Sequence, residues 1–135
     1  MKKDYTILKK AIFYLGLGCL FTHEMDAMLN REWRVLPLTG WLPDQAGMIT
    51  FQILHVPLAA LLIAWVASPA ASVRKRARLL ISAFLVIHGG LHILFSSSPN
   101  YEFASTISNV LIYGAALCGG GYLVLEAMST KRFPA

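Results

Sequence analysis

Residues 79–95, LLISAFLVIHGGLHILF, decide the fold of this chain. The stretch follows the basic run of residues 74–78, RKRAR, and precedes the turn-forming run of residues 96–100, SSSPN. Between these two boundaries there is no Lys, Arg, Asp or Glu. A helix of about 17 to 25 apolar residues crosses the hydrocarbon core of a bilayer. The stretch therefore predicts a transmembrane helix.

Three further apolar blocks flank this one, at about residues 8–29, 47–67 and 103–127. The chain has 135 residues, of which 56% are hydrophobic and only 14% are charged, fewer charges than a typical globular domain carries. The first block has a basic start but no small-residue cleavage pattern after it, so we expect an uncleaved span. We predict an all-α polytopic membrane protein whose residues 1–135 form one domain, a bundle of four transmembrane helices.

The basic residues predict the orientation of this bundle. Ten of the twelve lie in the N-terminal segment, in the turn at residues 68–78 and in the C-terminal tail, and only Arg31 and Arg34 lie elsewhere. Loops rich in Lys and Arg stay on the cytoplasmic side, so both chain ends are expected there. The same distribution explains the net charge of +5 without nucleic acid as a partner, and the lipid bilayer is the expected partner.

Histidines mark a polar layer inside the predicted spans. At 1.5 Å per helical residue, all four lie within roughly 5 to 15 Å of the outer boundary. Ionisable residues inside a membrane are costly and usually face the bundle interior. His88 and His92 are four residues apart and share one helix face. We therefore expect imidazoles from three helices to meet at one level.

Carboxylates accompany these histidines at comparable depth. Histidines and carboxylates that project inward from several helices form metal sites in helix bundles, and such a set fits zinc or non-haem iron. The predicted metal ligands are His23, Asp26, His55, His88 and His92. Two other carboxylates, Glu24 and Glu102, are predicted to have a catalytic role, because they could orient a ligand or move protons on bound water.

Four short motifs resemble those of a family of small, four-span bacterial membrane proteins of unknown function. They are residues 23–27 (HEMDA), 32–34 (EWR), 51–55 (FQILH) and 88–92 (HGGLH). The similarity extends over most of the chain. A looser similarity links the chain to membrane proteins named for an HxxEE motif, although Ala27 replaces the second acid of that motif. The resemblance implies the fold and a location in the bacterial inner membrane, and it implies no reaction.

Three functions remain open at this level. The first is a metal-dependent membrane enzyme that acts on a lipid-soluble substrate. The second is a haem b electron-transfer protein, in which His55 and either His88 or His92 would bind the iron from facing helices. The third is a non-enzymatic accessory subunit of a homo-oligomer or a larger membrane complex, in which the polar layer only holds helices together.

Overall fold

The computed structural model describes residues 5–130, and all regular structure in this range is helical. Four long helices follow one another: α1 (Thr6–Leu29), α2 (Asp44–Ala67), α3 (Ala71–Phe95) and α4 (Thr106–Thr130). A short 3₁₀ helix, η1 (Glu32–Arg34), lies between α1 and α2. The all-α class predicted from the sequence is confirmed.

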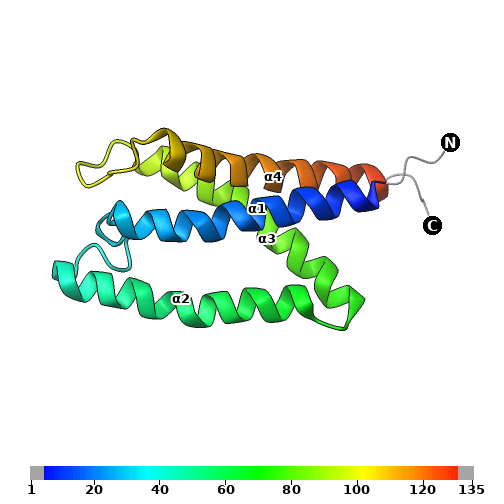
Figure 1. Cartoon of the computed structure of the whole chain (residues 1–135), viewed down its shortest axis with the longest axis horizontal. Helices are drawn as coiled ribbons and strands as arrows, with labels where there is room; N and C mark the ends of the chain where they lie inside the picture. The colour runs from blue at the N-terminus through cyan, green and yellow to red at the C-terminus, as the bar shows by residue number, and fades with distance from the viewer. Residues whose placement is uncertain (1–4, 131–135) are drawn as a thin grey trace.

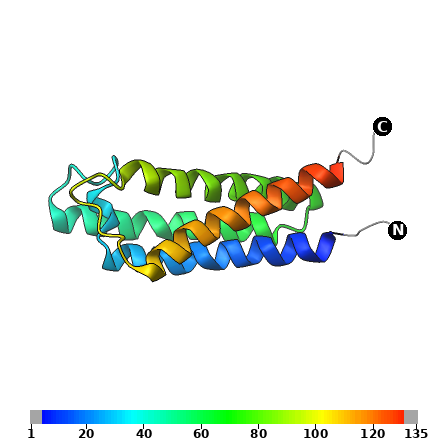
Figure 2. The same ribbon diagram turned by 90° about the horizontal axis from the view of Figure 1, so that it is seen from above.

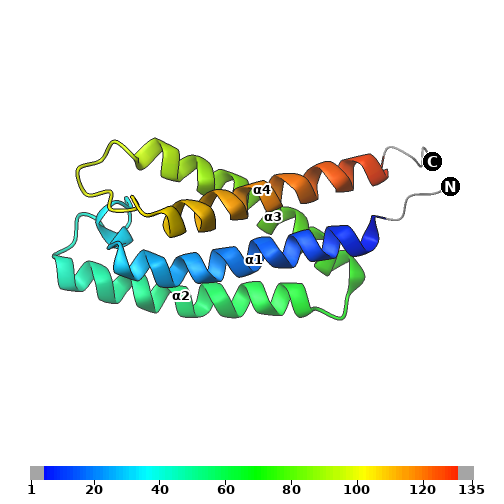
Figure 3. The same cartoon turned by 45° about the horizontal axis from the view of Figure 1, so that its top comes forward.

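Successive helices run in opposite directions along the molecule. The α1–α2 and α3–α4 loops therefore lie at one end, and the start of α1 and the end of α4 lie at the other (Figure 1, Figure 3). Helices α1, α2 and α3 end where the apolar blocks end, at Leu29, Ala67 and Phe95. Helix α4 begins three residues after the predicted Phe103. Its start is set by Ser105, whose hydroxyl accepts a hydrogen bond from the backbone N–H of Ser108 at 3.0 Å.

Helix α4 packs along both α1 and α3 and crosses them at a shallow angle (Figure 2). Small residues permit this close approach. A Cβ added to Gly119 would lie 2.5 Å from the backbone oxygen of Ser82, and one added to Gly16 would lie 2.8 Å from the Cβ of Cys118. Helix α2 is different, because it buries only Gly47 and Phe51 and its main contacts are with α3 and η1.

Among the described residues, three helices are long and apolar enough to cross a membrane: α2, α3 and α4 up to Ser129. These three helices indicate a multi-pass membrane protein. Helix α1 is as long as α2, at 24 residues. Its apolar middle is bounded by Lys9 and Lys10 at one end and by Glu24 and Asp26 at the other, which lowers its hydropathy.

Candidate metal centre

Three imidazole rings meet between α1 and α3, at the end of the molecule that holds the α1–α2 and α3–α4 loops. His23 lies on α1, and His88 and His92 lie one turn apart on α3. The ring centroids are separated by 4.7 to 5.0 Å, and the Nε2 atoms of His88 and His92 are 3.2 Å apart. All three side chains are buried. The i,i+4 spacing on α3 therefore brings two rings to one face, as the sequence predicts.

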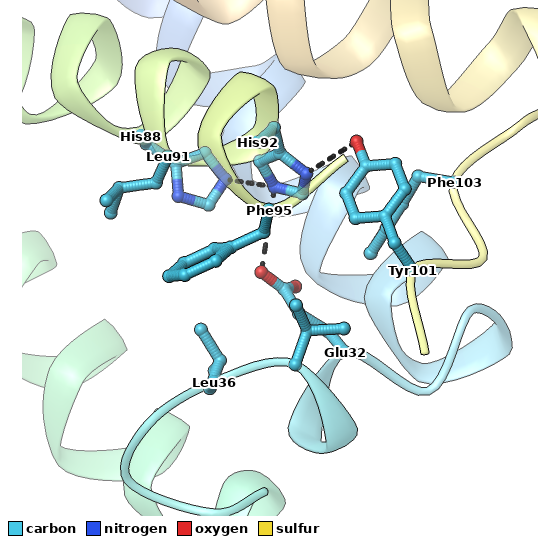
Figure 4. Close-up of a pocket in the computed structure, with 9 residues that line it drawn as sticks. Glu32, Leu36, His88, Leu91, His92, Phe95, Tyr101 and Phe103 are labelled. Carbon is cyan, nitrogen blue, oxygen red and sulfur yellow. Dashed lines mark hydrogen bonds and ion pairs between the residues drawn. The ribbon is translucent and has the colours of Figure 1, made fainter. Parts of the chain in front are cut away.

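The fourth member of this group is Glu32 of η1. Its Oε2 lies 3.6 Å from Nε2 of His23, and its Oε1 lies 3.6 Å from Nε2 of His92. Figure 4 shows the carboxylate directed from the loop toward His92, with His88 beside it. Glu32 is only 6% exposed, so its carboxyl group lies inside the protein. We call His23, Glu32, His88 and His92 the His/Glu cluster.

The loop after α1 is built to place Glu32 there. Arg31 adopts a left-handed backbone conformation, with φ 51° and ψ 45°, which ends α1 and turns the chain back toward the bundle. The indole N–H of the buried Trp33 then donates to Oδ1 of Asp44 at 2.9 Å. Arg34 binds both oxygens of the same carboxylate, at 2.7 and 2.9 Å. These contacts tie η1 to the first turn of α2.

The spacing of the donor atoms fits a metal ion. One ligand atom from each member of the His/Glu cluster lies within 4.8 Å of every other. Tetrahedral zinc with ligands near 2.05 Å requires donors about 3.3 Å apart. The observed distances of 3.2 Å for His88–His92 and 3.6 Å for each His–Glu32 contact bracket that value. The cluster could therefore hold a metal ion.

His23 is the clearest sign that the cluster is incomplete as a hydrogen-bond network. Its side chain is 1% exposed, yet neither Nδ1 nor Nε2 has a hydrogen-bond partner. Buried polar atoms in folded proteins are almost always satisfied, because leaving one without a partner costs free energy. A cation coordinated by one of these nitrogens would supply the partner that this nitrogen lacks.

Burial also raises the pKa of two groups at the loop side of the His/Glu cluster. Removal from water raises the pKa of Glu32 to about 8, and the nearby Glu24 carboxylate adds to the rise. Burial likewise raises the pKa of Tyr101 to about 12, so its hydroxyl stays protonated at neutral pH. The Tyr101 oxygen lies 3.2 Å from Nδ1 of His92. When Nε2 of His92 binds a metal, Nδ1–H can donate to this oxygen and hold the ring in place.

A small cavity adjoins the cluster. Its volume is about 30 Å³, and Glu32, His88, His92, Tyr101 and Phe103 contribute to its lining. This space is enough for about one water molecule. A small molecule could therefore occupy a position next to the four donor atoms.

The structure places the other predicted site residues outside the cluster. His55 pairs with Glu24, with 2.9 Å between Nε2 and Oε2. Asp26 is not a member of the group, and its Oδ2 is buried without a hydrogen-bond partner. Glu102 lies at the surface, where its carboxylate faces the guanidinium groups of Arg31 and Arg34 at 3.9 and 3.7 Å. The structure thus joins three of the five predicted ligands.

The sequence analysis did not predict Glu32, because its candidates were polar residues within the apolar blocks or directly beside them. The residue lies in the loop three positions after the end of α1, where a carboxylate is normally solvated. One signal was present, since Glu32 opens the EWR motif and precedes a tryptophan. A carboxylate beside a large aromatic residue at a helix boundary is a candidate for burial.

Fold and site together define a multi-pass helical membrane protein with a buried group of three histidines and one glutamate. The chain belongs to a family of unknown function, DUF6713, which it matches over residues 9–129. The matched range contains the complete His/Glu cluster. No curated protein and no solved structure matches the chain.

Proposed function

We propose that the chain crosses the membrane four times and that both of its ends lie in the cytoplasm. Helix α1 has 24 residues, enough for about 36 Å at 1.5 Å per residue. Its histidine, His23, is buried against α3 and avoids lipid. The charge distribution supports the orientation, because basic residues gather at the end opposite the His/Glu cluster. The natural location for such a chain is the bacterial inner membrane.

The function that the geometry supports best is binding of one divalent transition metal, zinc or iron, by His23, Glu32, His88 and His92. The observation that carries this proposal is the convergence of four buried donor atoms within 4.8 Å, drawn from two helices and a loop. Imidazole and carboxylate are ligands that zinc and non-haem iron accept. Burial without a cation would leave His23 without any hydrogen bond.

A metal at this position supports an enzymatic role on a lipid-soluble substrate. A bound divalent ion acts as a Lewis acid and lowers the pKa of a coordinated water. The adjoining cavity has room for such a molecule beside Glu32 and His92. Outside the cluster, the Glu24–His55 pair offers a group that can accept or release a proton. We therefore propose a metal-dependent membrane enzyme.

The haem alternative gains no support from the cluster. The rings of His23, His88 and His92 are in direct contact, with centroids 5.0 Å apart or less. A porphyrin plane must lie between two axial imidazoles, and these rings leave no slot for it. His55 of the proposed axial pairs is engaged instead with Glu24 and with the Phe51 carbonyl oxygen.

One observation favours a role as an accessory subunit. Helix α2 is the most apolar of the candidate spans, yet it buries only two of its 24 residues within the chain. Such a helix can pack against a second copy or another membrane protein. An accessory subunit could also hold a metal ion. Metal analysis therefore separates an accessory subunit with a metal site from one in which the polar layer is purely structural.

Elemental analysis of detergent-purified protein tests the metal proposal. Wild-type protein is expected to contain about one zinc or iron per chain, and His92→Ala is expected to contain almost none, because one of four ligands is lost. The matched control is His55→Ala, which removes a membrane histidine outside the cluster and should retain the metal. Folded wild-type protein that remains metal-free after incubation with zinc or iron would overturn the proposal.

Tyr101→Phe tests the support of His92. The substitution removes only the hydroxyl that contacts Nδ1 of His92, and loss of such a partner typically weakens metal affinity by about 10- to 100-fold. Tyr113→Phe is the control, because Tyr113, like Tyr101, packs against the buried apolar side chains around Phe103 and Ile112. Affinity is measured by competition with a chelator of known strength. Equal affinities for the two variants would exclude this role of Tyr101.

A further inference from the structure

An apolar groove runs between α1, α2 and α3, beside the His/Glu cluster. Its volume is about 340 Å³, within the range of small-molecule sites. Its walls include Leu20, Phe21, Leu58, Leu62, Trp65 and Phe84. The groove forms where α2 diverges from α3, away from the turn that connects them, and where α2 makes few contacts with α1 (Figure 1). Several of these side chains are partly exposed, so the groove opens toward the lipid.

Polarity is confined to one end of this groove. Glu24 and His55 are the two ionisable residues among those that line it, and they are paired with each other at 2.9 Å. Nδ1–H of His55 donates to the Phe51 carbonyl oxygen at 2.6 Å, which leaves Nε2 facing the Glu24 carboxylate. About a quarter to a third of each side chain remains exposed. The pair can therefore both donate to and accept from a ligand.

The length of the groove matches one hydrocarbon chain. From His55 to Trp65 there are ten helical steps, about 15 Å along α2. This is half of a hydrocarbon core about 30 Å thick, the depth that the chain of one lipid occupies in one leaflet. The groove thus has the dimensions and the one-sided polarity of an amphiphile.

We propose that the groove binds a single-chain amphiphile with a hydroxyl head group, its chain along α2 and its hydroxyl at Glu24 and His55. An ionic head group is disfavoured, because burying a charge at this depth is costly. A hydroxyl is inexpensive to bury when it donates to one partner and accepts from another. The imidazole and the carboxylate of this pair together offer both roles.

The proposed ligand lies next to the metal centre. Phe84 lines the groove and also packs against His88, with ring centroids 5.5 Å apart. Glu24 directly follows His23 on α1. The amphiphile is therefore placed as the substrate of the enzyme, a reading that rests on the proposed function, whereas binding in the groove requires no metal.

Fluorescence quenching at Trp65 tests the inference, in a Trp41→Phe background that removes the exposed loop tryptophan. The one other tryptophan that remains, Trp33, is buried and does not line the groove, so its emission is a constant background. The probe is a long-chain primary alcohol brominated near its methyl end, added to the protein in nanodiscs. Saturable quenching of Trp65 is expected. The matching brominated alkane should reach the same quenching only at an about tenfold higher concentration, because it cannot form hydrogen bonds with Glu24 and His55. Non-saturating quenching that is equal for the alcohol and the alkane would overturn the proposal.

Two neighbouring alanines supply a matched pair of variants. Ala59 lines the groove and Ala60 does not. Ala59→Phe should reduce saturable quenching about tenfold or more by filling the groove, and Ala60→Phe should leave it unchanged. Equal quenching in the two variants would also overturn the proposal. If Ala59→Phe does not fold, the comparison of the alcohol with the alkane, made on protein without a substitution in α2, decides the question.

Metal content is measured on the same samples, so that the two proposals can fail separately. A failed groove inference leaves the metal content at about one ion per chain. A failed metal proposal leaves the saturable quenching by the alcohol in place.

Discussion

Glu32→Ala is expected to lower the affinity for the metal more than about a hundredfold, because it removes the only anionic ligand of the cluster. The carboxylate lies 3.6 Å from both His23 and His92, so its loss also removes one of the links between α1 and α3 at this end of the bundle. Competition with a chelator measures the affinity, and the proportion of folded protein is checked by size-exclusion chromatography.

Glu102→Ala is the matched control for this substitution. Glu102 carries the same charge and lies near the same loop, but its carboxylate is 41% exposed and pairs only with surface arginines. Its removal should change the metal affinity less than about twofold, because exposed ion pairs contribute little. Retention of full affinity by Glu32→Ala, or an equal loss in both variants, would contradict the assignment of Glu32 as a ligand.

Gly119→Ala is expected to destabilise the bundle by about 1–3 kcal/mol, the usual cost of overpacking a close contact. The added Cβ would lie 2.5 Å from the Ser82 backbone oxygen and 2.9 Å from the Cβ of Leu85, and the backbone oxygen cannot yield without moving α3. Because α3 carries His88 and His92, a shift of this helix should also weaken metal binding. Denaturant titration in detergent gives the change in the free energy of unfolding.

Gly18→Ala provides the comparison on a glycine without neighbours. A Cβ at Gly18 meets nothing within 4 Å, and the position is exposed. This variant should be stabilised by about 0.5–1 kcal/mol, because alanine loses less backbone entropy in a helix than glycine does. If Gly119→Ala were as well tolerated as Gly18→Ala, close packing of α4 on α3 would not be what holds these helices together.

The histidines illustrate how much of the candidate metal site could be predicted from the sequence. Sequence spacing correctly predicted that His88 and His92 share a face, because the helical period is a local property of the backbone. Helix depth placed His23 at the same level as these two residues, and the structure brings the three rings together. Depth alone could not separate His23 from His55, since the two residues have similar predicted depths on different helices. Only the packing of α1 against α3 at this end of the bundle decided which ring joins the cluster.

The sequence by itself determined the helices and the apolar character of three of them, because hydropathy and helical periodicity are properties of short stretches of chain. It also determined which residues are costly to leave in lipid. The tertiary structure alone decided that Glu32, and neither Asp26 nor Glu102, completes the group of donors. That outcome depends on the left-handed turn at Arg31 and on the contacts of Trp33 and Arg34 with Asp44, which bring a loop residue back into the bundle across distances that no local pattern encodes.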